Sequence, residues 1–459
     1  MVKSQIHRPI SNADSRSSQG ARPAITKVYS IYVVALLLIA YTLSFIDRQI
    51  LSLLVGPIKQ DMSISDTEMS FLLGMSFALF YTIMGLPLGR LADTKDRPYL
   101  IALGISVWSF MTCLCGLAST YVQLFLARMG VGVGEASLSP AAYSLIADSV
   151  EEDNLGTAIS IYTMGIYLGG GLALIVGGAV VSWAVNLDAI SLPIIGSLYS
   201  WQLVLILVGL PGVIIAPLIL TLKEPRRVTK VTKVKSVPLK DVYRYFRENK
   251  KTILLHNFGT AFASLAGYGA MAWVPTYLMR THALTSTQIG IYFGLIVLFC
   301  GGSGVICGGR ISDKWQKMGK QDAKLRVPMI AALIGLVPSV LYPVMPTLSL
   351  VLMFLAVSTF FSNFMLGVAP AAIQEIVPKN MRGQFSALYL FIVNLIGLGI
   401  GPTAVALVTD KIFGDPESLK YSLVIVPTVA LFISACLYAA CLRSYRNTKV
   451  FLTQTTRTF

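Results

Sequence analysis

The chain has 459 residues, of which 55% are apolar or aromatic and only 13% are charged, and its net charge is +15. Soluble domains carry about 25% charged residues, so this composition excludes a water-soluble globule, and the high apolar content excludes a disordered chain. The positive charge alone would suit a nucleic-acid binder, so the position of the basic residues along the chain decides how that charge is interpreted.

The first 27 residues are polar and contain Ser, Arg and Pro. They hold no apolar core followed by a small-residue cleavage site, so we interpret residues 1–27 as an N-terminal tail and not as a signal peptide. Twelve apolar runs follow, each long enough for a helix that spans a bilayer, which needs about 20 residues. The sequence therefore predicts an all-α membrane protein. The runs cover residues 28–57, 66–92, 98–119, 121–148, 154–183, 199–222, 252–280, 285–312, 326–345, 347–377, 381–410 and 418–442.

The basic residues are distributed unevenly over the loops between these runs. If the N-terminus is cytoplasmic, 31 of the 37 Lys and Arg residues lie in cytoplasmic segments and four lie on the other side. This is the positive-inside pattern, so we expect a multi-pass protein of the cell membrane with both termini in the cytoplasm. Basic loops also meet anionic lipid headgroups, which explains the net charge without nucleic acid. We expect the lipid bilayer as a partner and no nucleic acid.

The longest loop divides the chain into two six-helix halves. We expect halves at 28–222 and 252–442, a cytoplasmic linker at 223–251 and a C-terminal cytoplasmic tail at 443–459. Three short segments recur in the same order in both halves, which indicates an internal duplication. Paired halves with a binding cavity between them are the architecture of secondary transporters. The recurring segments are Gly89–Asp93 with Gly309–Asp313, Ser139–Ala142 with Ala369–Ala372, and Gly156 with Gly383.

Several motifs together resemble the major facilitator superfamily. They are Gly89-x3-Asp93-x3-Arg97 with its echo Gly309-x3-Asp313-Lys314, Arg128-x3-Gly132, a Gly-rich fifth run, and Gly397-x-Gly399-x-Gly401-Pro402. The resemblance covers about residues 28–442 and implies two pseudo-symmetric six-helix halves that work by alternating access. The first loop departs from the superfamily pattern, because Thr94 and Asp96 stand where a basic residue and Gly are usual. The gating contacts attributed to that loop are therefore less secure in the first half.

Two shorter motifs are similar to the spinster-like branch of this superfamily. They are Phe45-Ile46-Asp47-Arg48 in the first run and Gly132-Val133-Gly134-Glu135-Ala136 in the fourth. The branch is associated with lipid-derived amphipaths, which implies a substrate with an anionic head and an apolar body. The alternatives are a carrier for small hydrophilic organic acids, a drug exporter of the same fold, and a membrane receptor of transporter shape. We expect the protein to be a monomer.

Four ionisable residues fall inside the predicted helices: Asp47, Arg48, Arg128 and Glu135. A charge at membrane depth costs several kcal/mol, so its presence calls for a function or a partner. Helix geometry places Asp47 and Arg128 at similar depth, so an ion pair between them is plausible, and Glu135 lies two turns along the same face as Arg128. We predict that Asp47, Arg128 and Glu135 couple proton binding to the movement of the halves. A purely structural ion pair is the alternative.

Further candidates are predicted to bind substrate or to gate its passage. Arg48 either holds an anionic substrate group in the cavity or extends toward the membrane surface. The tyrosines and asparagines fit aromatic packing or interhelical hydrogen bonding as well as substrate contact. We expect no metal, no cofactor and no enzymatic activity, since the three His residues are dispersed and no nucleotide-binding motif occurs. The substrate candidates are Arg48, Glu135, Tyr162, Tyr268, Asn363 and Asn394, and the gating candidates are Asp93, Arg97 and Asp313.

Overall fold

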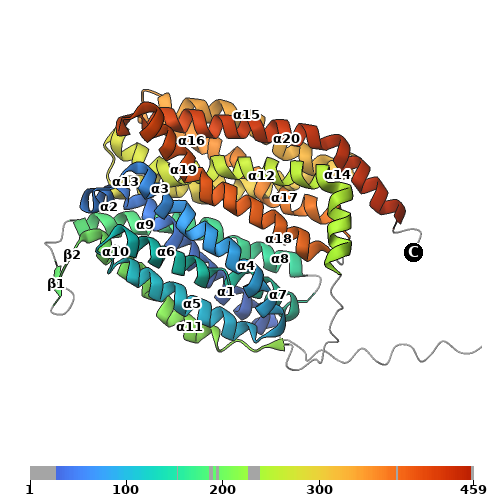
Figure 1. Ribbon diagram of the computed structural model, residues 1–459, viewed down its shortest axis with the longest axis horizontal. Helices are drawn as coiled ribbons and strands as arrows, with labels where there is room; N and C mark the ends of the chain where they lie inside the picture. The colour runs from blue at the N-terminus through green and yellow to red at the C-terminus, as the bar shows by residue number, and fades with distance from the viewer. Residues whose placement is uncertain are drawn as a thin grey trace, which may run out of the picture.

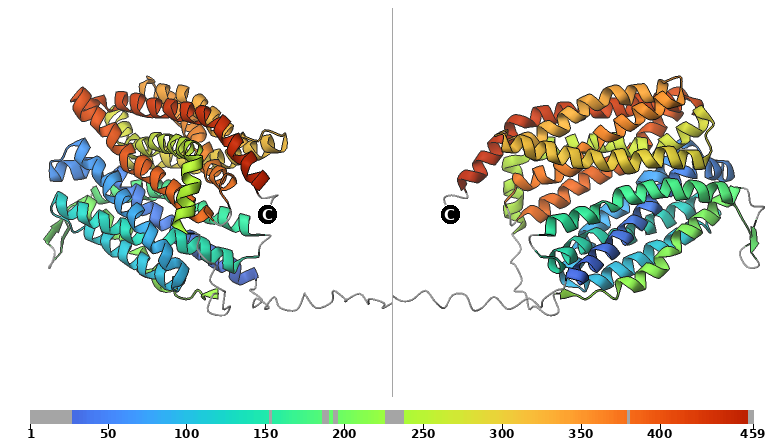
Figure 2. Two further views of the ribbon diagram at one scale, coloured as in Figure 1. Left: turned by 45° about the vertical axis from the view of Figure 1, so that its right-hand side comes forward. Right: turned by 180° about the vertical axis from the view of Figure 1, so that it is seen from behind.

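The computed structural model describes residues 27–151, 154–185, 190–192, 196–225, 238–378 and 381–455. Its helices form two groups that lie side by side, one from the first half of the chain and one from the second (Figure 1). The start of α1 and the end of α20 lie at the same end of both groups (Figure 2). We call this the terminal end and the opposite one the far end.

The first half contains long helices with two local changes of helix type. A 3-10 turn at Ile50–Leu53 follows α1, and a π segment at Phe71–Met75 precedes α4. Between α9 and α10 two short strands pair antiparallel, with Ser191 opposite Ser197. The elements are α1 (Lys27–Gln49), α2 (Val55–Met62), α3 (Asp66–Ser70), α4 (Ser76–Thr94), α5 (Arg97–Cys115), α6 (Tyr121–Glu135), α7 (Leu138–Ser149), α8 (Leu155–Thr163), α9 (Gly165–Val185), β1 (Ile190–Leu192), β2 (Gly196–Leu198), α10 (Ser200–Gly209) and α11 (Pro211–Ile219).

The second half begins with a 44-residue helix, α12, whose first turns lie within the predicted linker 223–251. Three π segments widen its helices, at Ile296–Gly301, Asn394–Ile400 and Val408–Phe413, and 3-10 turns occupy Tyr342–Val344 and Pro416–Ser418. The helices are α12 (Leu239–His282), α13 (Ser286–Leu295), α14 (Gly302–Lys317), α15 (Ala323–Leu341), α16 (Leu348–Ser362), α17 (Phe364–Glu375), α18 (Arg382–Val393), α19 (Gly401–Leu407) and α20 (Leu419–Thr455).

The helical runs confirm the predicted fold class. Ten of them in the described part of the chain are long and apolar enough to cross a membrane. The other two predicted crossings are α6 with α7, which break at Ala136 and Ser137, and α12, whose apolar part is interrupted by polar residues such as His256 and Asn257. Consecutive runs alternate in direction, as expected for two six-helix halves.

The two halves meet closely where α9 crosses α13. A Cβ atom added to Gly178 would lie 2.3 Å from the Ser286 carbonyl oxygen, and one added to Gly290 would lie 2.3 Å from the Leu174 carbonyl oxygen. Only glycine therefore permits this backbone approach, which is how small residues bring membrane helices together.

Polar contacts tie the halves together at the far end. Arg280 donates two hydrogen bonds to the Asp66 carboxylate, at 2.8 and 2.9 Å, and Lys59 binds the same carboxylate from within the first half. Close by, the Thr67 hydroxyl and backbone N–H donate to Asp410, each at 2.7 Å. The far end is therefore closed by hydrogen bonds between the halves.

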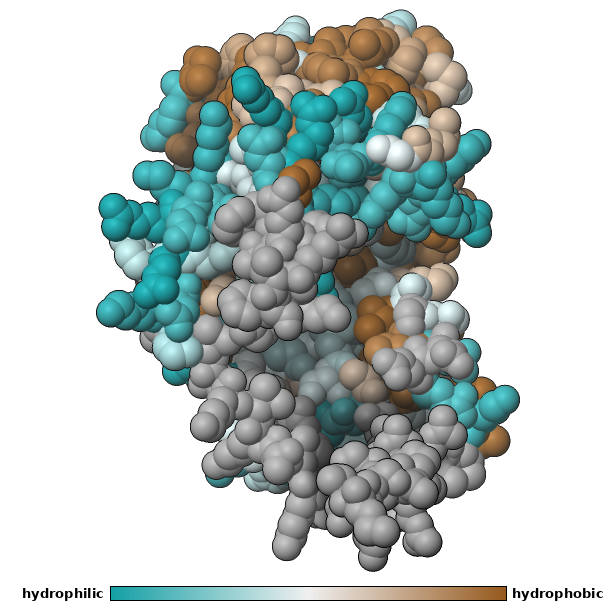
Figure 3. Space-filling view, turned by 90° about the vertical axis from the view of Figure 1, so that its right-hand side faces the viewer, coloured by the Kyte–Doolittle hydropathy of each residue, from teal (hydrophilic) through white to brown (hydrophobic). Residues whose placement is uncertain are grey.

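At the terminal end the ion pairs found among the described residues stay within one half. Arg97 binds Asp148 at 2.7 Å and also Glu224 in the first half, and Glu375 binds Lys449 at 2.8 Å and also Lys324 in the second. A space-filling view of this end shows a recess between the two halves (Figure 3). The conformation is closed at the far end and open toward the terminal end.

Candidate functional site

A cavity of about 180 Å³ lies between the two halves. Its walls come from α1, α4, α6 and α9 of the first half and from α12, α13, α15, α16, α17, α19 and α20 of the second. Leu73, Val297 and Leu398, each from a different π segment, also line it, in keeping with the frequent use of such widened turns at functional sites. Most lining residues are apolar, and the charged ones, Arg48 and Arg128, both come from the first half.

Arg48 and Glu135 form an ion pair at the edge of this cavity. Arg48 Nε donates to Glu135 Oε2 at 2.7 Å, and Ser44, one turn earlier on α1, donates its hydroxyl to the same oxygen. The Glu135 side chain is fully buried and that of Arg48 is 13% exposed. Three aromatic rings surround the guanidinium carbon, 4.5–4.7 Å from their centres: those of Phe45, Phe77 and Tyr81. This aromatic cage stabilises the cation while leaving one side of it open to the cavity.

The structure does not form the expected ion pair between the side chains of Asp47 and Arg128. Arg128 instead donates to the Asp47 backbone oxygen at 3.4 Å, and its guanidinium lies over the ring of Phe77. Both side chains are buried, and neither Asp47 Oδ1 nor Arg128 Nε has a hydrogen-bond partner among the described residues. Successive side chains on a helix point about 100° apart, so Arg48 on α1 faces the cavity whereas Asp47 does not line it.

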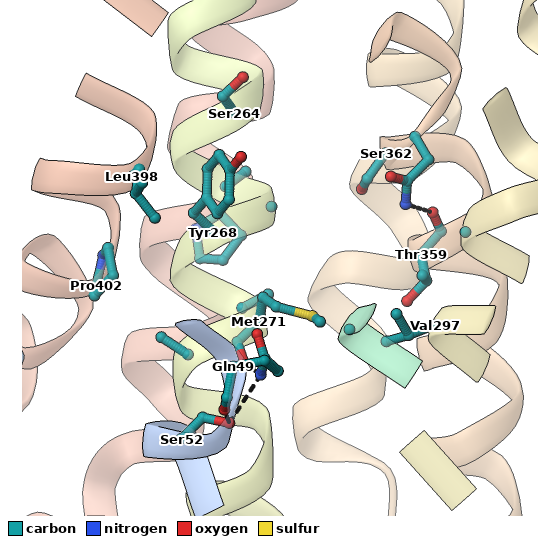
Figure 4. A pocket seen from close by; sticks show the side chains of 18 of the residues that line it. Gln49, Ser52, Ser264, Tyr268, Met271, Val297, Thr359, Ser362, Leu398 and Pro402 are labelled. Atoms are coloured by element: carbon teal, nitrogen blue, oxygen red, sulfur yellow. Dashed lines mark hydrogen bonds between the residues drawn. The ribbon is translucent and has the colours of Figure 1, made fainter. Parts of the chain in front are cut away.

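The second half contributes two of the predicted substrate residues, Tyr268 on α12 and Asn363 at the α16–α17 junction. Asn363 Nδ2 donates to the Thr359 carbonyl at 2.7 Å, and its Oδ1 accepts from the hydroxyl of Tyr167, on α9 of the first half, at 3.3 Å. In Figure 4, Ser264 and Tyr268 lie on one wall of the cavity and Thr359 on the opposite wall. The second half therefore offers hydrogen-bonding groups without charge.

Two other predicted substrate residues lie away from the lining. Tyr162 is buried in aromatic packing, stacked on Tyr41 at 4.5 Å and edge-on to Tyr143. Asn394 is the first residue of a π segment and is not among the cavity residues. Their substrate contact stays a prediction for another conformation of the protein.

The gating candidates differ in their surroundings. Arg97 is completely buried in the ion cluster with Asp148 and Glu224, so in this conformation it holds helices of the first half together. Asp313 is exposed near the end of α14, with no side-chain hydrogen bond or ion pair found in the part of the chain that the structure describes. The side chain of Asp93 lies outside the described residues.

Sequence reasoning missed several neutral residues of the cavity, among them Gln49, Ser52 and Ser264. Single uncharged polar residues are common in membrane helices as interhelical hydrogen-bond partners, so their pattern carried no signal for a binding site. It also missed the far-end contact between Asp66 and Arg280, since both residues fall at the ends of predicted runs, where charges are ordinary. Only the burial of Asp66, which is 1% exposed, distinguishes it.

The model of the Major Facilitator Superfamily matches residues 37–402. The chain belongs to this superfamily. It is 28% identical to an MFS-type efflux pump of Mycolicibacterium smegmatis over 90% of this chain and 93% of that protein. It is 24% identical to the hexuronate transporter of Bacillus subtilis over 83% of this chain and 88% of that protein.

A solved structure gives a further likeness. The chain is similar to a bacterial homologue of the human lysosomal transporter Spinster, in an inward-facing and unoccupied conformation. The match covers 92% of this chain and 98% of that protein. The TM-score is 0.74 and the sequence identity is 26%. The predicted membership in the spinster-like branch is thus confirmed, and the chain is an integral membrane transporter of this superfamily.

Proposed function

We propose that the protein carries an organic anion together with protons, by alternating access between its two halves. The observation that supports this proposal is the Arg48–Glu135 pair, in which a caged guanidinium at the cavity wall holds a fully buried carboxylate. A substrate anion that takes over Arg48 leaves Glu135 without its counter-charge. Burying an unpaired carboxylate costs several kcal/mol, and uptake of a proton removes that cost. Anion binding and proton binding are thereby linked.

Asp47 is proposed to take part in the same proton coupling, with Arg128 as its cationic neighbour. Asp47 is 3% exposed and one of its carboxylate oxygens has no partner among the described residues, so in the charged form it lacks full compensation here. A movement of α1 against α6 would bring it onto Arg128 or take it further away. The proton affinity of Asp47 would then follow the conformation of the protein.

The preferred substrate is an amphipathic molecule with an anionic head and an apolar body. Arg48 and Arg128 supply two cationic groups on one side of the cavity, and apolar side chains such as Leu355, Leu398 and Leu431 make up most of the rest. The cavity of about 180 Å³ suits a small molecule or the head of a larger one. In this proposal an apolar chain beyond the head lies in the recess between the halves at the terminal end (Figure 3).

A second candidate is a small hydroxylated organic acid. Ser264 and Tyr342 line the cavity, and their hydroxyls are buried and have no hydrogen-bond partner among the described residues. Buried polar groups of this kind favour a ligand that hydrogen-bonds to them. The relationship to a hexuronate transporter agrees with this reading. Thermal stabilisation of the purified protein by glucuronate, but not by hexanoate, would favour the hydroxylated acid, and the reverse would favour the amphipath.

We further propose that the terminal end faces the cytoplasm and that the protein works as a monomer in the cell membrane. The 31-to-4 distribution of basic residues over the two sets of loops supports this orientation. In that orientation the present conformation is open to the cytoplasm, because the halves are joined at the far end by Asp66 and Arg280. The cavity lies between the halves of a single chain, which supports transport by one copy.

The proton coupling is tested by Glu135→Gln in proteoliposomes that contain a pH-sensitive dye. We expect the variant to elute and melt like the wild-type protein but to lose proton uptake on addition of glucuronate or of a lysophosphatidate, whichever drives uptake in the wild type. Glu417→Gln, which changes an exposed carboxylate at the far end, is the matched control and should transport normally. Proton uptake at the wild-type rate in Glu135→Gln would remove Glu135 from the mechanism.

A further inference from the structure

Gln49 forms a polar contact between the two halves at the cavity wall. It is the last residue of α1, where the chain passes into the 3-10 turn Ile50–Leu53. Its Nε2 donates two hydrogen bonds, one to the Ser52 hydroxyl at 2.8 Å and one to the backbone oxygen of Met271 at 3.1 Å. Met271 belongs to α12 of the other half, and Figure 4 shows the two residues facing each other beside the cavity.

The Met271 carbonyl is available because of a proline one turn later. In a regular helix this oxygen would accept from the N–H of residue 275, but that residue is Pro275, inside α12. Proline has no N–H, so the carbonyl loses its intrahelical partner. Away from water, an unpaired backbone carbonyl is destabilising. Gln49, on the first half, therefore supplies the N–H donor that α12 lacks at Pro275.

The side chain of Gln49 is held in one orientation by its own neighbours. The Ser52 hydroxyl accepts from Nε2 and donates back to the Gln49 backbone oxygen at 2.8 Å, so both hydrogens of the amide are in use. No donor among the described residues binds Oε1, and Gln49 lines the cavity. The amide is thus fixed at the point where α1 and α12 touch.

We propose that Gln49 is a positioning residue of the transport cycle, which stabilises closure of the far end by pairing with the carbonyl that Pro275 leaves free. When the halves separate at the far end, water can enter and satisfy both groups, so the contact belongs to one conformation only. This inference rests on alternating access and not on proton coupling. The Glu135→Gln experiment can therefore fail without affecting it, and the reverse also holds.

The proposal is tested by a double-mutant cycle between Gln49→Met and Pro275→Ala. Methionine preserves the length of the side chain at position 49 but has no N–H, whereas Pro275→Ala restores the backbone donor for the Met271 carbonyl. Spin labels at Ser119 and Glu417, exposed at the far end of opposite halves, report the distance between the halves in a background whose accessible cysteines are replaced by serine. The readout is the ratio of long to short distances, that is, of open to closed far ends.

We expect Gln49→Met to raise the open-to-closed ratio by roughly three- to tenfold, the usual worth of one hydrogen bond. In the Pro275→Ala background the same substitution should change the ratio by less than about twofold, since the carbonyl then has its own helical donor. Equal effects in the two backgrounds would assign Gln49 to packing alone and overturn the proposal. An unchanged ratio in the single variant would do the same.

A second variant covers the case in which Pro275→Ala does not fold. Gln49→Glu, measured at pH 8, has nearly the shape of glutamine but no N–H donor. We expect it to open the far end at least as much as Gln49→Met does. A ratio like that of the wild-type protein would show that shape, and not the donated hydrogen bond, holds the two helices together.

Discussion

Neighbouring residues of α1 face different surroundings because a helix turns by about 100° per residue. Arg48 faces the cavity and pairs with Glu135, whereas the Asp47 carboxylate is buried away from it and only its backbone oxygen meets Arg128. The cost of charge in a membrane identified these residues from the sequence. The pairing itself depended on how α1 and α6 are rotated about their axes, and that rotation is set by packing that no single sequence position reveals.

The chemistry of Arg48 leads to a prediction at the scale of one residue. Arg48→Ala should weaken binding of an anionic ligand by about tenfold or more, since it removes a charge-assisted hydrogen-bond donor. A neutral analogue of the same size, such as the methyl ester of that ligand, should lose much less. The measurement is the ligand-dependent increase in melting temperature of the purified protein.

Arg48→Lys serves as the control for this prediction. Lysine keeps the charge but lacks the planar group that the rings of Phe45, Phe77 and Tyr81 enclose, so we expect intermediate binding of the anion. Equal losses for the anion and its ester in Arg48→Ala would assign the residue to helix packing.

The helices themselves were predictable because a run of about 20 apolar residues has few alternatives to spanning a membrane. The places where these helices break or change to another helix type were not predicted. The break of α6 after Glu135 lies one turn before Pro140, whose missing N–H leaves the Ala136 carbonyl without its helical donor, and sequence reasoning overlooked this signal. The π segment at Asn394–Ile400 falls in a Gly-rich stretch whose motif signalled only the family. Such local changes of helix type depend on contacts with neighbouring helices. They also shape the cavity, which is why its neutral lining was missed while its charged residues were found.

The glycines between α9 and α13 give a prediction at the scale of helices. Gly290→Ala should push these helices apart, because its Cβ would lie 2.3 Å from a backbone oxygen that cannot move away cheaply. We expect a lower melting temperature and a larger open population at the far end, measured with the same spin-label pair. Gly302→Ala, on the helix that continues from α13, is the control because nothing lies within 4 Å of its added Cβ. If both variants behave alike, the close crossing of α9 and α13 does not hold the far end closed.

Over the whole molecule, ionic contacts divide according to the end at which they lie. At the terminal end the described ion pairs link helices of the same half, so the halves can separate there without breaking them. At the far end Arg280 on α12 reaches across to Asp66 on α3, and at the cavity Gln49 reaches across in the other direction to Met271. Both contacts end on α12. This helix is therefore held to the first half by an ion pair near its end and by a neutral hydrogen bond at the cavity, on either side of Pro275.

Arg280→Gln should consequently shift the conformation of the whole protein without unfolding it. Lys59 remains beside Asp66, so the buried carboxylate keeps a counter-charge from its own half. The substitution removes the two bonds to Asp66 and one bond to the Pro416 backbone oxygen. Bidentate charge-assisted pairs are the stronger class of hydrogen bond, and we expect the open-to-closed ratio at the far end to rise about tenfold. Lys324→Gln removes an ion pair inside the second half whose basic side chain is exposed to a similar extent as that of Arg280, so it should lower the melting temperature and leave that ratio unchanged. A ratio that responds equally to both substitutions would mean that charge loss anywhere loosens the molecule, and that the far-end pair has no special part in closing it.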